Sequence, residues 1–143
     1  MVVADGTGLP LGNHLHSASP SEVQLAETTL ATICVGRQHR AGRPRQKPVR
    51  VIADRGYDSD PLRKQLARRG IELIAPHRKK RRKPRTQDGR ALRRYRRRWK
   101  MERTFAWIAN YRRLVVRYDR SLTIYQAFFH IACFMIVLRR VLK

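Results

Sequence analysis

Two carboxylates, Asp54 and Glu102, have sequence surroundings that suit chemistry on phosphate groups. Asp54 ends a short apolar run, residues 49–53, and precedes the turn-prone residues 55–57. Glu102 lies in a segment, residues 93–103, that is dominated by Arg and Lys. Carboxylate oxygens are ligands for divalent cations, and arginine binds phosphate oxygens through its planar fork of donors. The two acids therefore predict metal-assisted chemistry against a nucleic-acid backbone.

The spacing around Glu102 predicts that it lies on a helix. Positions 95, 98, 102, 105 and 109 follow an alternating three- and four-residue spacing, which places their side chains on one helical face. That face would carry, in order, Tyr95, Arg98, Glu102, Phe105 and Ala109. We expect this helix to run from Ala91 to Asn110.

The charge of the chain favours a polyanionic partner. Its 143 residues include 33 Lys and Arg against 10 Asp and Glu, a formal net charge of +23. Such self-repulsion is best relieved by nucleic acid. Cys34 and Cys133 are far apart and form no C-x-x-C pair, so neither a disulfide framework nor a zinc site is indicated. With no secretory leader pattern at the N-terminus, we expect a cytoplasmic, nucleoid-associated protein.

The remaining segments alternate between strand and helix patterns. A D-G turn between two apolar stretches predicts a hairpin at the N-terminus. In chain order, we expect a hairpin over 1–15, a helix over 22–34 capped by Ser19 or Ser21, a loop over 37–48, a strand over 49–54, a helix over 60–69 capped by Asp60, and a strand over 71–75. This order predicts one α/β domain over residues 1–143, with a mixed sheet, parallel pairings and flanking helices.

Two further segments complete the expected organisation. Residues 77–90, rich in Lys, Arg and Pro, predict a basic loop that is solvated or disordered until DNA binds. Residues 121–142 predict an apolar C-terminal helix. Its most apolar part, 122–138, contains Gln126 and His130 and is only 17 residues long, so we expect a largely buried helix and no membrane contact.

Two motifs resemble a known family. ADRGYD at residues 53–58 and YRRRWKMERTF at residues 95–105 resemble the C-terminal catalytic part of DDE transposases of bacterial insertion sequences, with further support from RRL at 112–114 and RYDR at 117–120. The resemblance implies a ribonuclease H-like fold in which three acids hold Mg²⁺ or Mn²⁺ for strand cleavage and transfer at transposon ends. It makes Asp54 the second acid and Glu102 the third, both as catalytic residues and as metal ligands.

The chain departs from the family pattern at two places. The first acid belongs on a strand upstream of the N-terminal hairpin, and Asp5, in the D-G turn, is a poor substitute. We therefore expect a domain truncated on its N-terminal side, inactive alone, with an upstream fragment or a second copy on DNA as partners. The family often places a basic residue seven positions after the glutamate, where this chain has Ala109; Arg112 or Arg113 would replace it.

The resemblance also implies residues that contact DNA at transposon ends and target. Tyr95 and Arg98 match the family motif, and the basic residues around them add to the surface: Arg94, Arg97, Arg103, Arg112 and Arg113. Each acid has a plain structural alternative, Asp54 as a turn residue and Glu102 as an ion-pair partner of Arg98. The alternative functions are a non-catalytic basic DNA-binding remnant and a ribosome-associated or RNA-packaging protein.

Overall fold

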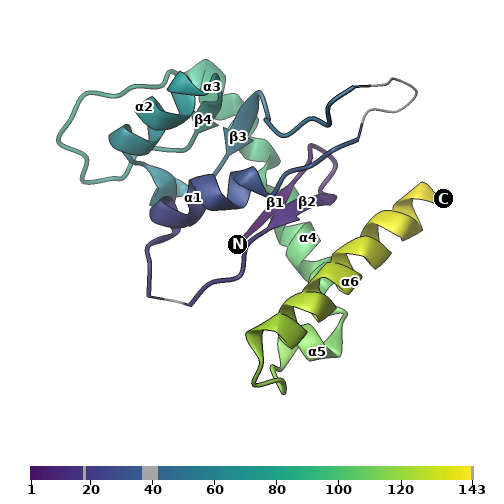
Figure 1. The fold of residues 1–143 in the computed structure, drawn as a ribbon. Helices are drawn as coiled ribbons and strands as arrows, with labels where there is room; N and C mark the ends of the chain where they lie inside the picture. Colours follow the sequence, from purple (N-terminus) through teal and green to yellow (C-terminus); the bar gives the residue numbers. More distant parts are fainter. Residues whose placement is uncertain (18, 37–41, 143) are drawn as a thin grey trace.

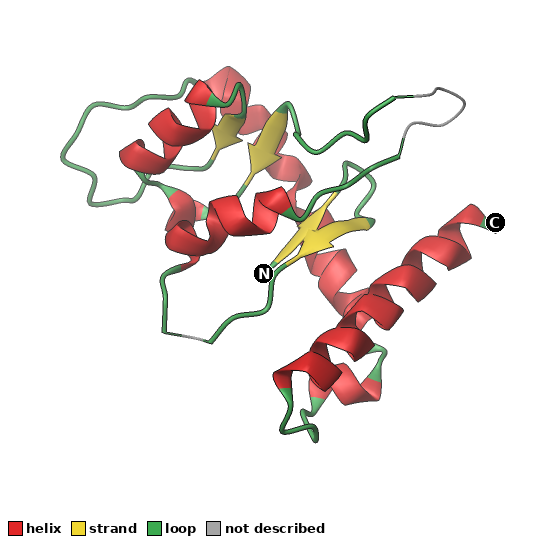
Figure 2. Cartoon of the chain, in the orientation of Figure 1, coloured by secondary structure: helices red, strands yellow, loops and turns green. Residues whose placement is uncertain are grey.

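The computed structural model describes residues 1–17, 19–36 and 42–142 (Figure 1). The expected loop over 37–48 therefore lies in part outside the described residues. The elements, in chain order, are β1 (Val2–Ala4), β2 (Pro10–Asn13), α1 (Glu22–Ala31), β3 (Arg50–Ile52), the 3₁₀ turn η1 (Arg55–Tyr57), α2 (Asp60–Arg68), β4 (Glu72–Ile74), α3 (Gly89–Tyr95), the 3₁₀ turn η2 (Arg96–Arg98), α4 (Trp99–Ala109), α5 (Arg112–Val115) and α6 (Leu122–Val141). Figure 2 shows α4 passing behind the β1–β2 hairpin towards α5 and α6.

The strands form two separate pairs within the described residues. β1 and β2 are antiparallel, with Val3 opposite Gly12. β3 and β4 are parallel, with Val51 opposite Leu73, and α2 makes the crossover between them. The N-terminal hairpin and the parallel pair confirm the sequence predictions. The expected single mixed sheet is instead present as two two-stranded sheets.

One hydrophobic cluster holds α1 and α2 against the β3–β4 pair. Its buried members are Ala26, Leu30, Ile33, Leu62, Leu66, Ile71 and Leu73. A second cluster, around Ile108, Phe129 and Ile136, packs α4 and α6 beneath the hairpin. The two clusters place Asp54 and Glu102 on different packed units.

The ends of α2 are fixed by its flanking residues. Ser59 is the N-cap, and its hydroxyl accepts a hydrogen bond from the backbone N–H of Leu62 at 3.4 Å. The prediction that Asp60 caps this helix was therefore wrong by one residue, since Asp60 is already helical and its carboxylate binds Arg81. Gly70 adopts a φ of +70°, the left-handed conformation that commonly ends a helix.

The segment expected as one helix over 91–110 is divided by η2. α3 starts at Gly89, so the loop expected over 77–90 ends at Asp88, whose carboxylate accepts from the N–H groups of residues 90 and 91. The arginines at 93 and 97, and at 94 and 98, would be neighbours one turn apart in a continuous helix, and their repulsion disfavours that arrangement. The 3₁₀ turn η2, with three residues per turn, therefore separates the helix that ends at Tyr95 from the helix that carries Glu102.

The C-terminal helix has the expected bounds and a different environment. α6 runs from Leu122 to Val141, with Ser121 as N-cap. Only Phe129, Ala132 and Ile136 are buried, whereas large apolar residues such as Ile131 and Phe134 are more than half exposed. The expectation of a largely buried helix was therefore wrong. Within the described residues, α6 is the one helix long and apolar enough to cross a membrane, and 17% of its apolar window is buried.

Candidate functional site

Asp54 lies directly after β3, at the start of the turn η1. Its Oδ1 accepts a hydrogen bond from the Gly56 backbone N–H at 2.7 Å, so the carboxylate caps the 3₁₀ turn. Gly56 has little space for a side chain here, because a Cβ at this position would lie 2.9 Å from Asp54 Oδ1. The turn thus holds a half-buried carboxylate at the carboxyl end of a parallel strand. Asp54 therefore does have the capping role of the structural alternative, while leaving Oδ2 available.

Glu102 lies in the first turn of α4, with its side chain two-thirds exposed. Its Oε1 accepts from Arg98 Nη2 at 3.1 Å, four residues earlier. This is the ion pair of the structural alternative, and it leaves the second carboxylate oxygen open to solvent. Arg98 is itself partly buried, so the pair belongs to the flank of the molecule where α4 faces the sheets.

A groove of about 670 Å³ is lined by Asp54 and by the partner of Glu102, Arg98. Asp54 lines it from the end of β3, and Arg98, Met101 and Phe105 line it from the η2–α4 segment. Glu102 does not line the groove and is connected to it through Arg98. The rest of the lining is mainly apolar and includes both β1 and β3. The structure thus brings Asp54 and the partner of Glu102 to one concave surface.

The position of α4 is fixed by the turn between β1 and β2. Asp5 closes this turn, because its Oδ1 accepts from the backbone N–H groups of Thr7 at 2.7 Å and Leu9 at 2.9 Å. Three successive carbonyl oxygens of the turn accept from three side chains of α4: Gly6 from Lys100, Thr7 from Arg103 and Gly8 from Thr104. We call this set the turn clamp. It holds the helix that carries Glu102 against the hairpin.

Arg103, a predicted DNA-binding residue, belongs to the turn clamp and also contacts two tryptophans. Arg103 lies between two indole rings, 5.0 Å from the centre of the Trp99 ring and 4.9 Å from that of Trp107. Its guanidinium thus combines cation–π contacts with the bond to the turn. Trp99 and Trp107 therefore both have Arg103 as an intramolecular partner.

The other predicted DNA-binding residues differ in their exposure. Arg94, Arg97 and Arg112 are exposed, and Arg97 lies at the rim of the groove. Tyr95 is half-buried at the end of α3. Arg113 is 3.9 Å from Asp119 and lies over the Phe128 ring at 4.5 Å, so it helps to hold α5 against α6.

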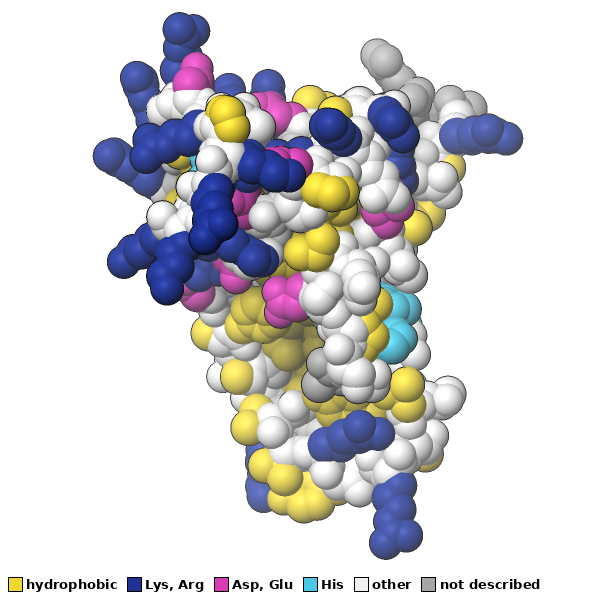
Figure 3. Space-filling model, turned by 90° about the vertical axis from the view of Figure 1, so that its left-hand side faces the viewer, with side chains coloured by type: hydrophobic (Ala, Val, Ile, Leu, Met, Phe, Trp, Pro, Cys, Tyr) yellow, Lys and Arg dark blue, Asp and Glu magenta, His cyan; other side chains and the backbone are white. Residues whose placement is uncertain are grey.

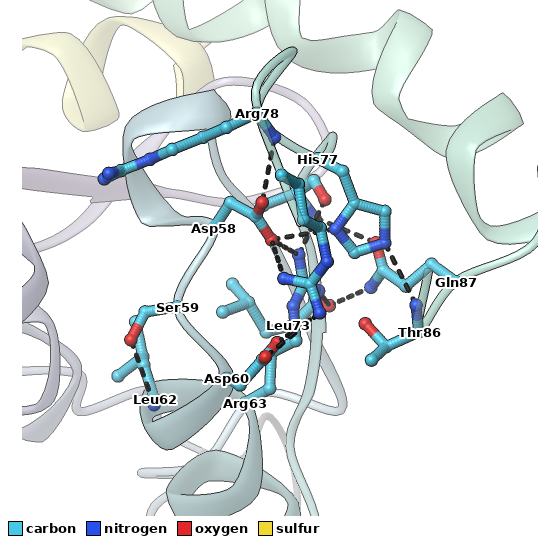
Figure 4. A network of polar contacts seen from close by, with 12 residues as sticks. Asp58, Ser59, Asp60, Leu62, Arg63, Leu73, His77, Arg78, Thr86 and Gln87 are labelled. Carbon is cyan, nitrogen blue, oxygen red and sulfur yellow. Dashed lines mark hydrogen bonds and ion pairs between the residues drawn. The ribbon is translucent and has the colours of Figure 1, made fainter. Parts of the chain in front are cut away.

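Sequence reasoning missed a buried polar network centred on Asp58 (Figure 4). The Asp58 side chain is only 2% exposed and accepts from Arg63 Nη2 at 3.0 Å, His77 Nδ1 at 2.9 Å, the Arg78 backbone N–H at 2.8 Å and Arg81 Nη1 at 3.4 Å. Burial by itself raises the pKa of this carboxyl, but the bonds from Arg78, Arg63 and His77 outweigh burial and lower the pKa to about 2. Asp58 is therefore an anchor for the segment that follows β4.

A sequence signal for this network was present. Parallel strands end at the same edge of a sheet, so the loops after β3 and β4 must meet. The first of these loops carries Asp58 and Asp60, and the second carries a run of Lys and Arg. Opposite charges on loops that must lie side by side predict ion pairs. Asp60 was instead interpreted as the cap of α2, a role that belongs to Ser59.

The histidines and cysteines of the chain lie apart from the two carboxylates in the sequence. His14 and His16 have ring centres 5.8 Å apart. Across residues 1–17, 19–36 and 42–142, no group of three His, Cys, Asp or Glu side chains is arranged to hold a metal ion. Both cysteines are free.

The chain is similar to known proteins over nearly its whole length. Residues 1–138 match the family model described as transposase DDE domain. Over 135 residues the chain is 38% identical to a protein of Burkholderia cepacia named as a putative transposase for insertion sequence element IS402. That match covers 94% of this chain and 60% of the relative, so the chain spans less than two thirds of the relative's length. No solved structure matches the chain.

Proposed function

The chain belongs to the transposase DDE domain family, and from this premise we propose that it is part of a ribonuclease H-like catalytic domain that cleaves and transfers DNA strands at the ends of an insertion sequence. In this proposal Asp54 and Glu102 are two of three metal-binding acids, and the third is supplied by a strand outside these 143 residues. The observation that carries the proposal is the groove between β1 and β3, which has Asp54 at its edge.

The two carboxylates suit a divalent cation in their chemistry. Both offer hard oxygen ligands, the kind that Mg²⁺ prefers, and each has one oxygen that is bound by a protein donor, Gly56 N–H or Arg98. When bound, a pair of such ions supplies Lewis-acid stabilisation for an in-line displacement at phosphorus. The protein's own contribution is to hold Asp54 by its turn and Glu102 by its helix. The exposed arginines of η2 bind the backbone phosphates of the DNA.

The backbone of the groove supports the need for a further strand. Met1 exchanges both backbone hydrogen bonds with His14, at 2.7 and 2.9 Å. Because successive residues of a strand direct their backbone N–H and C=O groups to opposite edges, those of Val2 and Ala4 point away from β2. On the other side, Ala53 N–H donates to the Ile74 carbonyl at 3.0 Å, so alternation directs the groups of β3 residues 50 and 52 away from β4. Both strand edges line the groove.

A strand placed between these edges would pair with β1 and β3 at once. It would join the two small sheets into one mixed sheet and cover the apolar lining of the groove. Without such a strand, the backbone groups on these two edges have no ladder partner among the described residues, an arrangement that proteins usually avoid. An acid on this strand near Asp54 would complete the three-carboxylate set.

The test is complementation. The chain is mixed with the portion of the Burkholderia cepacia relative that lies outside the match, and nicking of a plasmid carrying insertion-sequence ends is measured with Mg²⁺. The intact relative serves as the positive control, and Asp54→Asn and Glu102→Gln variants of this chain serve as matched controls. We expect cleavage only in the mixture, and loss of cleavage in both variants.

The same experiment separates the proposed function from the alternative. If the mixture binds DNA without cleaving it while the intact relative cleaves, the chain is a non-catalytic DNA-binding remnant. A second readout is Mn²⁺ binding by the mixture, followed by electron paramagnetic resonance. The proposal requires that both carboxylate variants weaken this binding.

A further inference from the structure

The basic loop, residues 76–88, is folded onto the start of α2 and onto β4. At its beginning, His77 Nδ1 donates to Asp58, and His77 Nε2 accepts from the Thr86 backbone N–H at 3.1 Å. At its end, Gln87 donates to the Leu73 carbonyl and accepts from the Ala75 N–H at 3.3 Å. Both ends of the loop are therefore bonded to the body of the protein. Of the two alternatives predicted for this loop, the structure agrees with the solvated one, because most of its side chains are exposed.

Apart from Arg78, which binds the Gly56 carbonyl oxygen, the Lys and Arg side chains of this loop fall into two groups. Arg81 points inward and is 11% exposed; its guanidinium donates to Asp58, to both Asp60 oxygens at 2.9 and 3.0 Å, and to the carbonyl oxygens of residues 83 and 84. The outward group consists of exposed side chains: Lys79, Lys80, Arg82, Lys83 and Arg85. Figure 3 shows Lys and Arg side chains gathered on the upper part of this side of the molecule. The inward arginine thus shapes a loop whose outer surface is strongly positive.

The basic loop is also bonded to the turn that holds Asp54. Arg78 Nη2 donates to the Gly56 carbonyl oxygen at 3.0 Å, and the Gly56 N–H donates to Asp54 Oδ1 at 2.7 Å. Two hydrogen bonds therefore connect the loop with the candidate catalytic carboxylate. A phosphate backbone lying on the outward cations would be held beside the edge of the sheet that carries Asp54.

We propose that the basic loop is a preorganised docking surface for the backbone of duplex DNA, and that Asp58 is the positioning residue that holds it in shape beside Asp54. This inference rests on the proposed action on DNA and adds the surface and its anchor. A loop that is already ordered loses little conformational freedom on binding, so its cations contribute more to affinity than the same cations on a free segment. Five outward cations that each neutralise one phosphate would contribute about −4.5 to the slope of log affinity against log salt, at about −0.9 per phosphate.

The test uses the direction of the change in DNA affinity, which differs according to whether the shape of the loop or the net charge of the protein controls binding. Asp58→Asn removes a negative charge, so charge alone predicts tighter DNA binding; loss of the anchor predicts weaker binding. Glu27→Gln, on α1, is the matched control with the same charge change away from the loop. Gln87→Ala releases the other end of the loop with no charge change and serves if Asp58→Asn fails to fold. Each variant is titrated with a short labelled duplex over a series of salt concentrations, using fluorescence anisotropy.

We expect Asp58→Asn and Gln87→Ala to bind duplex DNA on the order of 3- to 10-fold more weakly than the wild type, with a shallower salt slope. Glu27→Gln should keep the wild-type slope. The double variant Lys79→Gln, Lys80→Gln should lose about 1.8 of the slope, two phosphates at about 0.9 each. Trypsin should cut the loop faster in both anchor variants than in the control, which confirms that the loop was released.

Two results overturn the inference. If the anchor variants are cut faster by trypsin but bind duplex DNA like Glu27→Gln, with the wild-type slope, the shape of the loop does not matter and the inference fails alone. Preference of the wild type for single-stranded over duplex DNA overturns the assigned partner. A wild-type chain without salt-dependent DNA binding would contradict the proposed function as well, so the two failures are distinguishable.

Discussion

Replacing Thr104 with valine tests the turn clamp that positions the Glu102 helix. Thr104 is 0% exposed, and its hydroxyl donates to the carbonyl oxygen of buried Gly8 at 2.6 Å. Thr104→Val keeps the shape of the side chain and removes the donor. The Gly8 carbonyl then remains buried without this partner, which costs about 1–3 kcal/mol. We expect the free energy of unfolding to fall by that amount.

The assay is urea unfolding at neutral pH, followed by tryptophan fluorescence. Trp99 and Trp107 both contact Arg103, which belongs to the clamp, so their emission reports on this part of the protein. The matched control is Thr104→Ser, which keeps the hydroxyl and loses one buried methyl group, at a cost of about 0.8 kcal/mol. The denaturant slope should stay the same in both variants if only stability changes.

The relative stability of the two variants shows whether the Thr104 hydroxyl or its methyl group matters more. The clamp predicts that Thr104→Val is more destabilised than Thr104→Ser, because the lost hydrogen bond outweighs the lost methyl group. If the serine variant is the less stable of the two, Thr104 acts through packing alone. A valine variant as stable as the wild type would refute the reasoning that the Gly8 carbonyl needs this donor.

Three further predictions concern stability. The pKa of Asp58 is lowered from 3.8 to about 2 in the folded protein. The ionised carboxylate therefore contributes about 1–2 kcal/mol to the free energy of unfolding above pH 4, and this contribution is lost as the pH falls through about 2. In acid titrations, the stabilities of the wild type and of Asp58→Asn should converge near that pH. Gly8→Ala should cost about 1–2 kcal/mol in thermal unfolding, since Gly8 has a φ of +89° and a Cβ would lie 3.2–3.3 Å from clamp atoms. Leu66→Ala, at a site 1% exposed, should cost about 2–5 kcal/mol in urea unfolding, and a smaller loss would mean that the core relaxes around the cavity.

Local signals in the sequence were sufficient for most of the regular elements, although they did not predict that η2 divides the segment 91–110. The D-G turn predicted the N-terminal hairpin, and the apolar runs before Asp54 and after Gly70 predicted strands that pair in parallel. Ser121 and the apolar run after it predicted the bounds of α6. These features depend on neighbours in the chain, which is why pattern reasoning could find them. The family assignment, based on the motifs around Asp54 and Glu102, is confirmed by the family match.

Features that depend on distant contacts were not predictable from local patterns. The environment of α6 depends on how much apolar surface the rest of the chain can offer it, and the described residues bury only one side. The Asp58 network joins three segments, so no single window of sequence contains it. The turn clamp connects residues more than 90 positions apart. The roles of the site residues remain predictions, because the family match does not test them individually.

The arrangement of the two carboxylates has a physical consequence for activity. Asp54 belongs to the unit built on β3, β4, α1 and α2, whereas Glu102 is clamped to the hairpin β1–β2. No strand ladder connects the two units within the described residues, so their separation depends on side-chain packing. Divalent cations require ligands at defined distances, and binding weakens when the ligands are free to move relative to one another. A strand that pairs with β1 and β3 together would fix this separation through backbone hydrogen bonds. The groove is therefore the part of the molecule on which the proposed catalytic geometry depends most.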